Sequence, residues 1–284
     1  MEIKRVGVVG CGTMGSGIAQ VCAQSGYQVV VSEAKDELLN KGLASINSFL
    51  TKSVERGKVS QADKEATLAR IKGTTNTKDL SDCDLVVEAA IEDMDLKKKI
   101  FAELDKICPK DSILATNTSY LSVIEMASVT TRPDKFLGLH FFNPVPLMKL
   151  LEVVKAIATS DETLEVGKSF GESIGKTVVV AQDTPGFIVN RLLMPFYLDA
   201  IRMLEAGIAT KEDIDAAITL GLGHPMGPFA LRDLVGIDAT LNGVNAMCDR
   251  TKDPKFAPPT LLKNMVAAGW LGRKTGKGFY EYNK

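Results

Sequence analysis

The chain has 284 residues, of which 45% are hydrophobic and 24% are charged. These proportions exclude a disordered chain, a collagen-like fibre and a disulfide-stabilised mini-protein. Because 34 Lys and Arg residues stand against 35 Asp and Glu residues, the formal net charge is -1, which argues against a general role in binding nucleic acid or anionic membranes.

Short apolar runs alternate with helical segments through the first 180 residues. Val-rich runs over 3–9 and 28–32 flank a helical segment over 15–25. Strands buried on both faces by such helices predict a doubly wound α/β domain, that is, a Rossmann-like and mostly parallel sheet. Five further runs continue the pattern: 85–87, 112–116, 136–140, 150–154 and 177–180.

The first run leads into the segment GCGTMG at residues 10–15, a G-x-G-x-x-G pattern that a helix follows. Gly10 permits a tight turn, Gly12 lets a pyrophosphate approach the backbone, and Gly15 allows close packing of helix and strand. With Thr13 and Met14 they form a loop whose free N–H groups are expected to hold the phosphates of a dinucleotide.

Glu33 ends the second strand, 23 residues after Gly10. A carboxylate there accepts hydrogen bonds from the ribose hydroxyls and repels a 2′-phosphate, which favours NAD over NADP. The neighbouring Lys35 partly offsets that repulsion, so NADP is the less favoured alternative. FAD is the other candidate for this fold, but the further motifs it requires are missing from the sequence.

A long helical region, about 36–72, follows the second strand and is expected to form an inserted hairpin. Its second helix is predicted to begin at Ser60, with Asp63 as capping partner. Lys52 and Arg56 lie four residues apart and share one helix face. A solvated face is the plainer interpretation of these two charges.

His140 ends the apolar run at 136–140. Ligands of open parallel sheets bind beyond the carboxyl ends of the strands, so His140 is placed where a ligand would bind. Glu152 interrupts the next apolar run, and a carboxylate there needs a partner. A turn containing Pro144 and Pro146 would bring Glu152 beside His140, where it would fix the tautomer of the imidazole.

Three polar residues are further candidates for the site. Ser119 follows a strand and is placed to bond a substrate oxygen, Asn143 is placed to reach a ribose or the cofactor amide, and Asn190 lies early in a helix where a polar side chain faces a cleft. Plainer roles are helix capping, turn formation and a helix-end contact, respectively. His224 lies in a Gly/Pro-rich loop and is interpreted as structural or channel-lining, and no His, Asp or Glu pair has the spacing of metal ligands.

Beyond residue 184 the strand pattern stops. Helical segments at 187–205, 210–221, 228–250 and 259–268 predict an all-helical domain over 185–284, following the Rossmann-like domain over 1–184. Five scattered cysteines without a C-x-x-C pair predict free thiols in a reducing compartment. The first residues contain no secretory signal and no apolar run reaches about 18 residues, so we expect a cytoplasmic protein.

Several segments together resemble the L-3-hydroxyacyl-CoA dehydrogenase family over essentially the whole chain, and most closely its bacterial members that act on 3-hydroxybutyryl-CoA. They are VGVVGCGTMGSGIAQ, EAAIED at 88–93, NTS at 117–119, HFFNPVPLMKLLEVV at 140–154, DTPGFIVNRLL at 183–193 and GRKTGKGFYEY. The segment at 140–154 is the most specific of them.

The resemblance implies reversible oxidation of a (3S)-3-hydroxyacyl-CoA by NAD, here interconverting acetoacetyl-CoA and 3-hydroxybutyryl-CoA. It assigns His140 as the catalytic base, Glu152 as its orienting carboxylate, and Ser119 and Asn190 as ligands of the substrate oxygens. The hairpin corresponds to the element that covers CoA, and the helical domain to the dimer interface, so a homodimer or higher homo-oligomer is implied. Residues matched to CoA phosphates are Lys52 and Arg56, and those matched to positions near the cofactor are Glu92, Lys97, Asn143 and Lys274.

Two alternatives stay open at this point. One is a dehydrogenase of a sugar acid such as L-gulonate on the same scaffold, which would not need hairpin cations for CoA. The other is a non-catalytic NAD-binding structural protein, whose expected mark is loss of the His–Glu pair.

Overall fold

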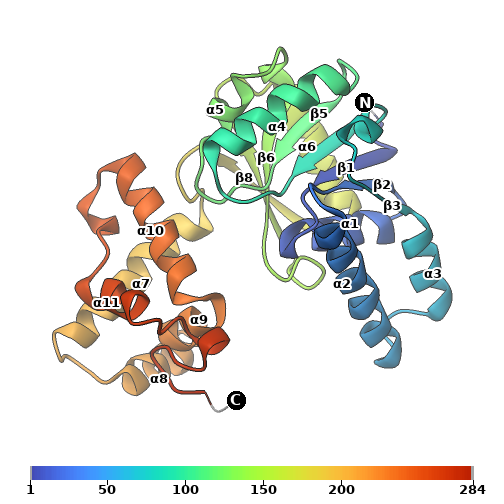
Figure 1. Cartoon of the computed structure of the whole chain (residues 1–284). Coiled ribbons are helices and arrows are strands. Elements are labelled where there is room, and N and C mark those ends of the chain that lie inside the picture. The colour runs from blue at the N-terminus through green and yellow to red at the C-terminus, as the bar shows by residue number, and fades with distance from the viewer. Residues whose placement is uncertain (1, 283–284) are drawn as a thin grey trace. The chain divides into compact units, whose positions relative to one another are not determined.

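The computed structural model describes residues 2–282 (Figure 1). The chain divides into two compact units, Met1–Thr184 and Pro185–Lys284.

The N-terminal unit is built on one sheet of eight strands in the order β3-β2-β1-β4-β5-β6-β7-β8. All neighbouring strands are parallel except β6 and β7, which form an antiparallel pair. The predicted Rossmann-like, mostly parallel sheet is therefore confirmed. The strands are β1 Arg5–Val9, β2 Gln28–Ser32, β3 Ile71–Thr74, β4 Leu85–Glu88, β5 Ile113–Thr116, β6 Phe136–Phe141, β7 Leu150–Lys155 and β8 Thr177–Gln182.

Strand β3 corrects one expectation, because the hairpin was expected to extend to residue 72. Ile71–Thr74 instead pairs with β2 at the edge of the sheet. Its sequence IKGT has one aliphatic residue and no buried position, so it lacks the continuous apolar run that marks the inner strands.

Helices cover the sheet and bury the inner strands on both faces. Val6, Val8 and Val87 are fully buried, as expected for parallel strands that lie between helices. The helices of this unit are α1 Thr13–Gln24, α2 Asp36–Glu55, α3 Gln61–Ala69, α4 Met94–Ile107, α5 Val123–Ala127 and α6 Asp161–Ser173.

Helices α2 and α3 form the predicted hairpin, and Figure 1 shows the pair extending beyond the sheet. The capping prediction is confirmed, since the Ser60 hydroxyl accepts a hydrogen bond from the Asp63 N–H at 3.0 Å. Leu39, Ile46 and Leu50 of α2 are buried against the unit, which leaves the opposite face of the helix for polar residues.

The C-terminal unit is helical, and its backbone turns at glycines in left-handed conformations. Helix α8 ends at Gly223 (φ +67°), two residues later than the expected Gly221, and Gly236 (φ +114°) separates α9 from α10. The first helix begins at Val189 and not at Phe187, which has a positive φ. The helices are α7 Val189–Glu205, α8 Lys211–Leu222, α9 Pro228–Val235, α10 Ile237–Thr251 and α11 Thr260–Ala267.

Two buried carboxylates hold the end of this unit together. Asp233 accepts hydrogen bonds from the backbone N–H groups of Phe279 and Tyr280, both at 2.9 Å. Asp215 accepts from the Tyr280 hydroxyl at 3.0 Å. The GRKTGKGFYEY motif thus ties residues 279–280 to helices α8 and α9. None of the helices formed by residues 2–282 is both apolar enough and long enough to cross a bilayer.

Candidate active site

A cavity of about 620 Å³ opens where the strand order reverses, between β1 and β4. Ligands of open α/β sheets bind at this position, beyond the carboxyl ends of the strands. Neither His140 nor Ser119 is among the lining residues, so the cavity suits the adenosine and phosphate part of a dinucleotide. The lining includes Gly10, Gly12, Thr13, Glu33, Lys41 and Ile91.

The glycine loop has the geometry that a dinucleotide requires. Gly10 has a φ of +96°, and a Cβ on Gly15 would lie 1.8 Å from the Gly10 carbonyl oxygen. A Cβ on Gly12 would instead meet no atom within 4 Å, so the space in front of this residue is open. No side chain caps the start of α1, which leaves N–H groups free to bind an anion. The residues present therefore fit a pyrophosphate.

Glu33 closes the loop from the end of β2. Its carboxylate accepts hydrogen bonds from the backbone N–H groups of Cys11 at 2.9 Å and Ala34 at 2.6 Å. Helix α2 packs on the other side of Cys11, where a Cβ on Gly42 would lie 2.1 Å from the Cys11 carbonyl oxygen. The carboxylate is therefore fixed beside the loop while its side chain stays half-buried.

His140 and Glu152 face each other across the antiparallel β6–β7 pair. The His140 Nδ1 atom lies 2.6 Å from Glu152 Oε2, and both residues are buried, with 3% and 0% of their surface exposed. A buried carboxylate only accepts hydrogen bonds, so the proton is assigned to Nδ1. This assignment directs Nε2 of the neutral ring outward as a proton acceptor.

The other ring nitrogen of His140 contacts the loop after β5. Its Nε2 atom lies 3.0 Å from the Ser119 hydroxyl. Asn117, in the same loop, accepts the Phe141 backbone N–H at 2.9 Å and so ties this loop to the end of β6. Local sequence patterns did not single out Asn117, because its partner Phe141 lies 24 residues away in the chain.

Glu92 also contacts this loop, and Lys97 in turn contacts Glu92. Glu92 Oε1 accepts hydrogen bonds from the Thr118 hydroxyl at 2.5 Å and the Ser119 N–H at 2.9 Å. Lys97 is 1% exposed, and its Nζ atom lies 2.5 Å from Glu88 and 3.5 Å from Glu92. Glu88 was missed, although a carboxylate at the end of the apolar run LVVE is the same signal that singled out Glu152.

The remaining candidates lie elsewhere. Lys52 and Arg56 are exposed at the end of α2, and Asn143 is exposed in the loop after β6. Asn190 and Lys274 belong to the C-terminal unit, where Lys274 binds the Asp238 carboxylate at 2.6 Å. In the same unit, the centroid of the His224 ring lies 6.0 Å from the centroid of the Phe196 ring. The roles of all six residues stay predictions.

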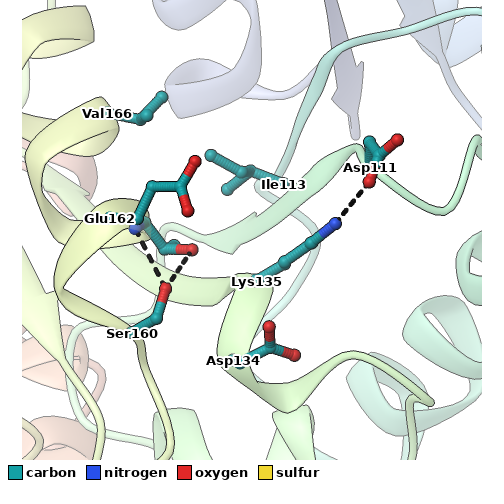
Figure 2. A pocket seen from close by; sticks show the side chains of 8 residues that line it. Asp111, Ile113, Asp134, Lys135, Ser160, Glu162 and Val166 are labelled. Carbon is teal, nitrogen blue, oxygen red and sulfur yellow. Dashed lines mark hydrogen bonds and ion pairs between the residues drawn. The ribbon is translucent and has the colours of Figure 1, made fainter. Parts of the chain in front are cut away.

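A second cavity, of about 470 Å³, lies at the amino-terminal ends of strands β5 and β6. Figure 2 shows Lys135 reaching Asp111 there, with an Nζ to Oδ1 distance of 2.5 Å. Ile113 and Ser160, which also line it, stand at the beginnings of β5 and α6. Because ligands of such sheets bind beyond the carboxyl ends of the strands, this cavity is not the candidate site.

Comparison with known families covers both units. Residues 5–184 match the family model described as 3-hydroxyacyl-CoA dehydrogenase, NAD binding domain. Residues 186–282 match the model described as 3-hydroxyacyl-CoA dehydrogenase, C-terminal domain.

Individual proteins are similar over the same extent. The 3-hydroxybutyryl-CoA dehydrogenase of Clostridioides difficile is 47% identical over 280 residues, covering 99% of this chain and 100% of that protein. The enzyme of the same name from Bradyrhizobium diazoefficiens is 45% identical, covering 99% and 96%. The crystal structure of the (S)-3-hydroxybutyryl-CoA dehydrogenase of Ralstonia eutropha has a TM-score of 0.96 at 44% identity and covers 100% of both chains.

Proposed function

The chain belongs to the 3-hydroxyacyl-CoA dehydrogenase family, and from this we propose that it interconverts acetoacetyl-CoA and (3S)-3-hydroxybutyryl-CoA with NAD as cofactor. The family resemblance predicted from the motifs is confirmed, and the chain is an oxidoreductase with an NAD-binding domain. The observation that carries the proposal is the position of His140, held between the Glu152 carboxylate and the Ser119 hydroxyl near the carboxyl end of β6.

The chemistry of the chain's own residues follows from this arrangement. Nε2 of His140 takes the proton of the 3-hydroxyl in the oxidative direction and returns it to the oxygen in the reductive direction. The Glu152 carboxylate stabilises the imidazolium that forms, and an acid–base group in this position typically contributes about 10²–10⁴ in rate. The Ser119 hydroxyl stabilises the charge that develops on the substrate oxygen, and the family resemblance gives Asn190 the same role. When bound, NAD supplies the hydride acceptor.

The preference for NAD over NADP is part of the proposal and rests on Glu33. A 2′-phosphate beside this carboxylate would place like charges together in a half-buried site, whereas ribose hydroxyls would donate to it. Gly10, Gly12, Thr13, Met14 and Gly15 would hold the pyrophosphate at the start of α1. Glu92, Lys97, Asn143 and Lys274 are proposed to lie near the cofactor.

Binding of the CoA moiety is proposed for the α2–α3 hairpin. Lys52 and Arg56 lie four residues apart at the end of α2, are exposed, and form no ion pair within residues 2–282. Two cations that no carboxylate neutralises are suited to the phosphates of CoA. We extend the proposal to a cytoplasmic homodimer or higher homo-oligomer.

The direct test is a steady-state assay of 3-ketoacyl-CoA substrates from C4 to C10, with NADH and NADPH side by side. The expected result is reduction of acetoacetyl-CoA with NADH preferred. A parallel reaction with a keto-sugar acid serves as the comparison. Turnover of the sugar acid without turnover of any acyl-CoA would replace the proposal by the alternative dehydrogenase, and no turnover of either would favour the non-catalytic role.

A further inference from the structure

In the loop that connects β6 to β7, residues 142–149, few internal hydrogen bonds stabilise the backbone conformation. Pro144 and Pro146 lack a backbone N–H, and Leu147 and Met148 are 59% and 41% exposed. Within the loop, the N–H groups of Leu147 and Met148 both bond the Pro144 carbonyl, at 2.9 and 3.0 Å. A loop so exposed needs contacts from outside to keep one conformation.

One such contact comes from α1. Val145 is buried, and a Cβ on Gly17 would lie 2.9 Å from the Val145 Cβ. The loop therefore packs against the helix that follows the glycine motif, but this contact is apolar and fixes only the middle of the loop.

The second contact comes from Lys176, just before β8. This residue is only 9% exposed, and its Nζ atom donates to the carbonyl oxygens of Val145 at 2.5 Å and Met148 at 2.8 Å. No carboxylate within residues 2–282 forms an ion pair with Lys176. Burial lowers the pKa of this amine, as expected for a desolvated cation. A buried cation without a counter-ion is costly, so its two charge-assisted bonds to one loop are its principal compensation.

The loop that Lys176 holds belongs to the candidate site at both of its ends. It follows His140 and precedes Glu152, which are paired in the β6–β7 ladder. It also carries Asn143, whose side chain is exposed and proposed to lie near the cofactor. The ladder itself keeps His140 and Glu152 in register, whereas Asn143 lies outside it and depends on the loop.

We propose that Lys176 is a positioning residue for the cofactor, acting as a clamp that holds the 142–149 loop and thereby Asn143. The assignment rests on the proposed function, because it gives Asn143 its role. Lys176 does not touch the reacting atoms. Its removal therefore affects cofactor binding more than the proton transfer at His140.

The first experiment measures the loop without reference to activity. Hydrogen exchange of the Leu147 and Met148 amides is compared in wild type, Lys176→Met and Lys149→Met. Lys149 is an exposed lysine of the same loop, so its variant controls for loss of charge. Exchange is expected to accelerate about tenfold or more in Lys176→Met and to stay unchanged in Lys149→Met, since only the former loses the bonds to the loop. Equal exchange in wild type and Lys176→Met overturns the proposal.

The second experiment separates positioning from simple destabilisation. In Lys176→Met the Kd and KM for NADH are expected to rise about tenfold, with a smaller fall in kcat, whereas Lys149→Met matches wild type. A lower Tm with unchanged NADH affinity would mean that Lys176 is merely structural and would reject the clamp. If Lys176→Met does not fold, Lys176→Gln keeps an N–H donor and is expected to show an intermediate rise in Kd. Wild-type affinity in Lys176→Gln counts against the clamp.

The two proposals fail in different ways. Wild type that does not reduce acetoacetyl-CoA rejects the proposed substrate, while the exchange and NADH-binding results still decide the clamp. Wild type that reduces acetoacetyl-CoA, together with a Lys176→Met variant that binds NADH normally, rejects the clamp alone.

Discussion

The Nδ1 atom of His140 lies 2.6 Å from the Glu152 carboxylate, directly across one antiparallel strand pair. Replacing Glu152 by Gln keeps the size of the side chain and removes the charge. We expect kcat to fall by about 10²-fold or more, because the imidazolium loses its stabilising partner and the amide no longer selects one tautomer.

His140→Ala is expected to abolish turnover while NADH binding survives.

Steady-state kinetics and a fluorescence titration with NADH measure these effects. Glu172→Gln, which changes an exposed Glu of the same unit, is the control and should match wild type. Near-full acetoacetyl-CoA reduction by His140→Ala or Glu152→Gln would contradict the assignment.

Substitutions at two glycines of the phosphate loop are expected to affect different properties, NADH affinity in one case and thermal stability in the other. In Gly12→Ala the new methyl group meets no protein atom, so the Tm of the free protein should not change, but NADH affinity should fall because the methyl group occupies the approach of the pyrophosphate. In Gly15→Ala the methyl group collides with the Gly10 carbonyl, and overpacking of this kind costs about 1–3 kcal/mol or more. Thermal unfolding and NADH titration of both variants test this. A Gly12→Ala protein with wild-type affinity would exclude the pyrophosphate from this loop.

Glu33 is expected to decide the choice of dinucleotide. Glu33→Gln removes the charge that opposes a 2′-phosphate, so the ratio of kcat/KM for NADH to that for NADPH should fall about tenfold, equivalent to about 1.4 kcal/mol. Glu37→Gln removes a charge from the first turn of α2 and should leave the ratio unchanged. An unaltered ratio in Glu33→Gln would show that another group discriminates.

The hairpin cations are expected to serve the CoA end of the substrate. Lys52→Glu combined with Arg56→Glu should raise the KM for acetoacetyl-CoA about tenfold at low ionic strength, and added salt should shrink the effect because both groups are exposed. The KM for the N-acetylcysteamine thioester of acetoacetate, which lacks the CoA phosphates, should not respond. Lys106→Glu, an exposed site on α4, is the matched control. Equal effects on both thioesters would reject phosphate binding by the hairpin.

The buried thiols predict a loss of stability at alkaline pH. Burial raises the pKa of Cys22 to about 12 and that of Cys11 to about 11, whereas thiols of an unfolded chain ionise near pH 8.5. Above that pH the unfolded state binds fewer protons than the folded state, so the free energy of unfolding falls as pH rises. Below the pKa that these thiols have in the unfolded chain, they do not reduce the free energy of unfolding.

Urea unfolding between pH 7.5 and 10 measures this slope. Cys22→Ala should make the slope shallower, by up to about 1.4 kcal/mol per pH unit for the one thiol removed. Identical slopes for wild type and Cys22→Ala would contradict the linkage.

Local sequence rules predicted the elements whose causes are local. The glycine loop is specified by steric demands within six residues, and the His140–Glu152 pair was predicted because a carboxylate interrupts an apolar run. Strand β3 was missed because an edge strand needs no apolar run, and its pairing with β2 is decided by residues 42 positions away.

Burial of Lys97 is the clearest case of information that the sequence does not carry locally. Three consecutive lysines, Lys97, Lys98 and Lys99, look equivalent in the chain, yet only the first is fully buried and bonded to Glu88. The rotation of α4 against the sheet decides which lysine turns inward. The bond from Phe141 to Asn117 likewise joins the end of β6 to the loop after β5, two segments that meet only in the folded sheet.

The glycine loop, Glu33 and the His140–Glu152 pair all lie before Thr184, within one of the two units. The groups proposed to select the dinucleotide and to relay the proton are therefore inherited together. A recombination between genes at this boundary would transplant both properties in one event.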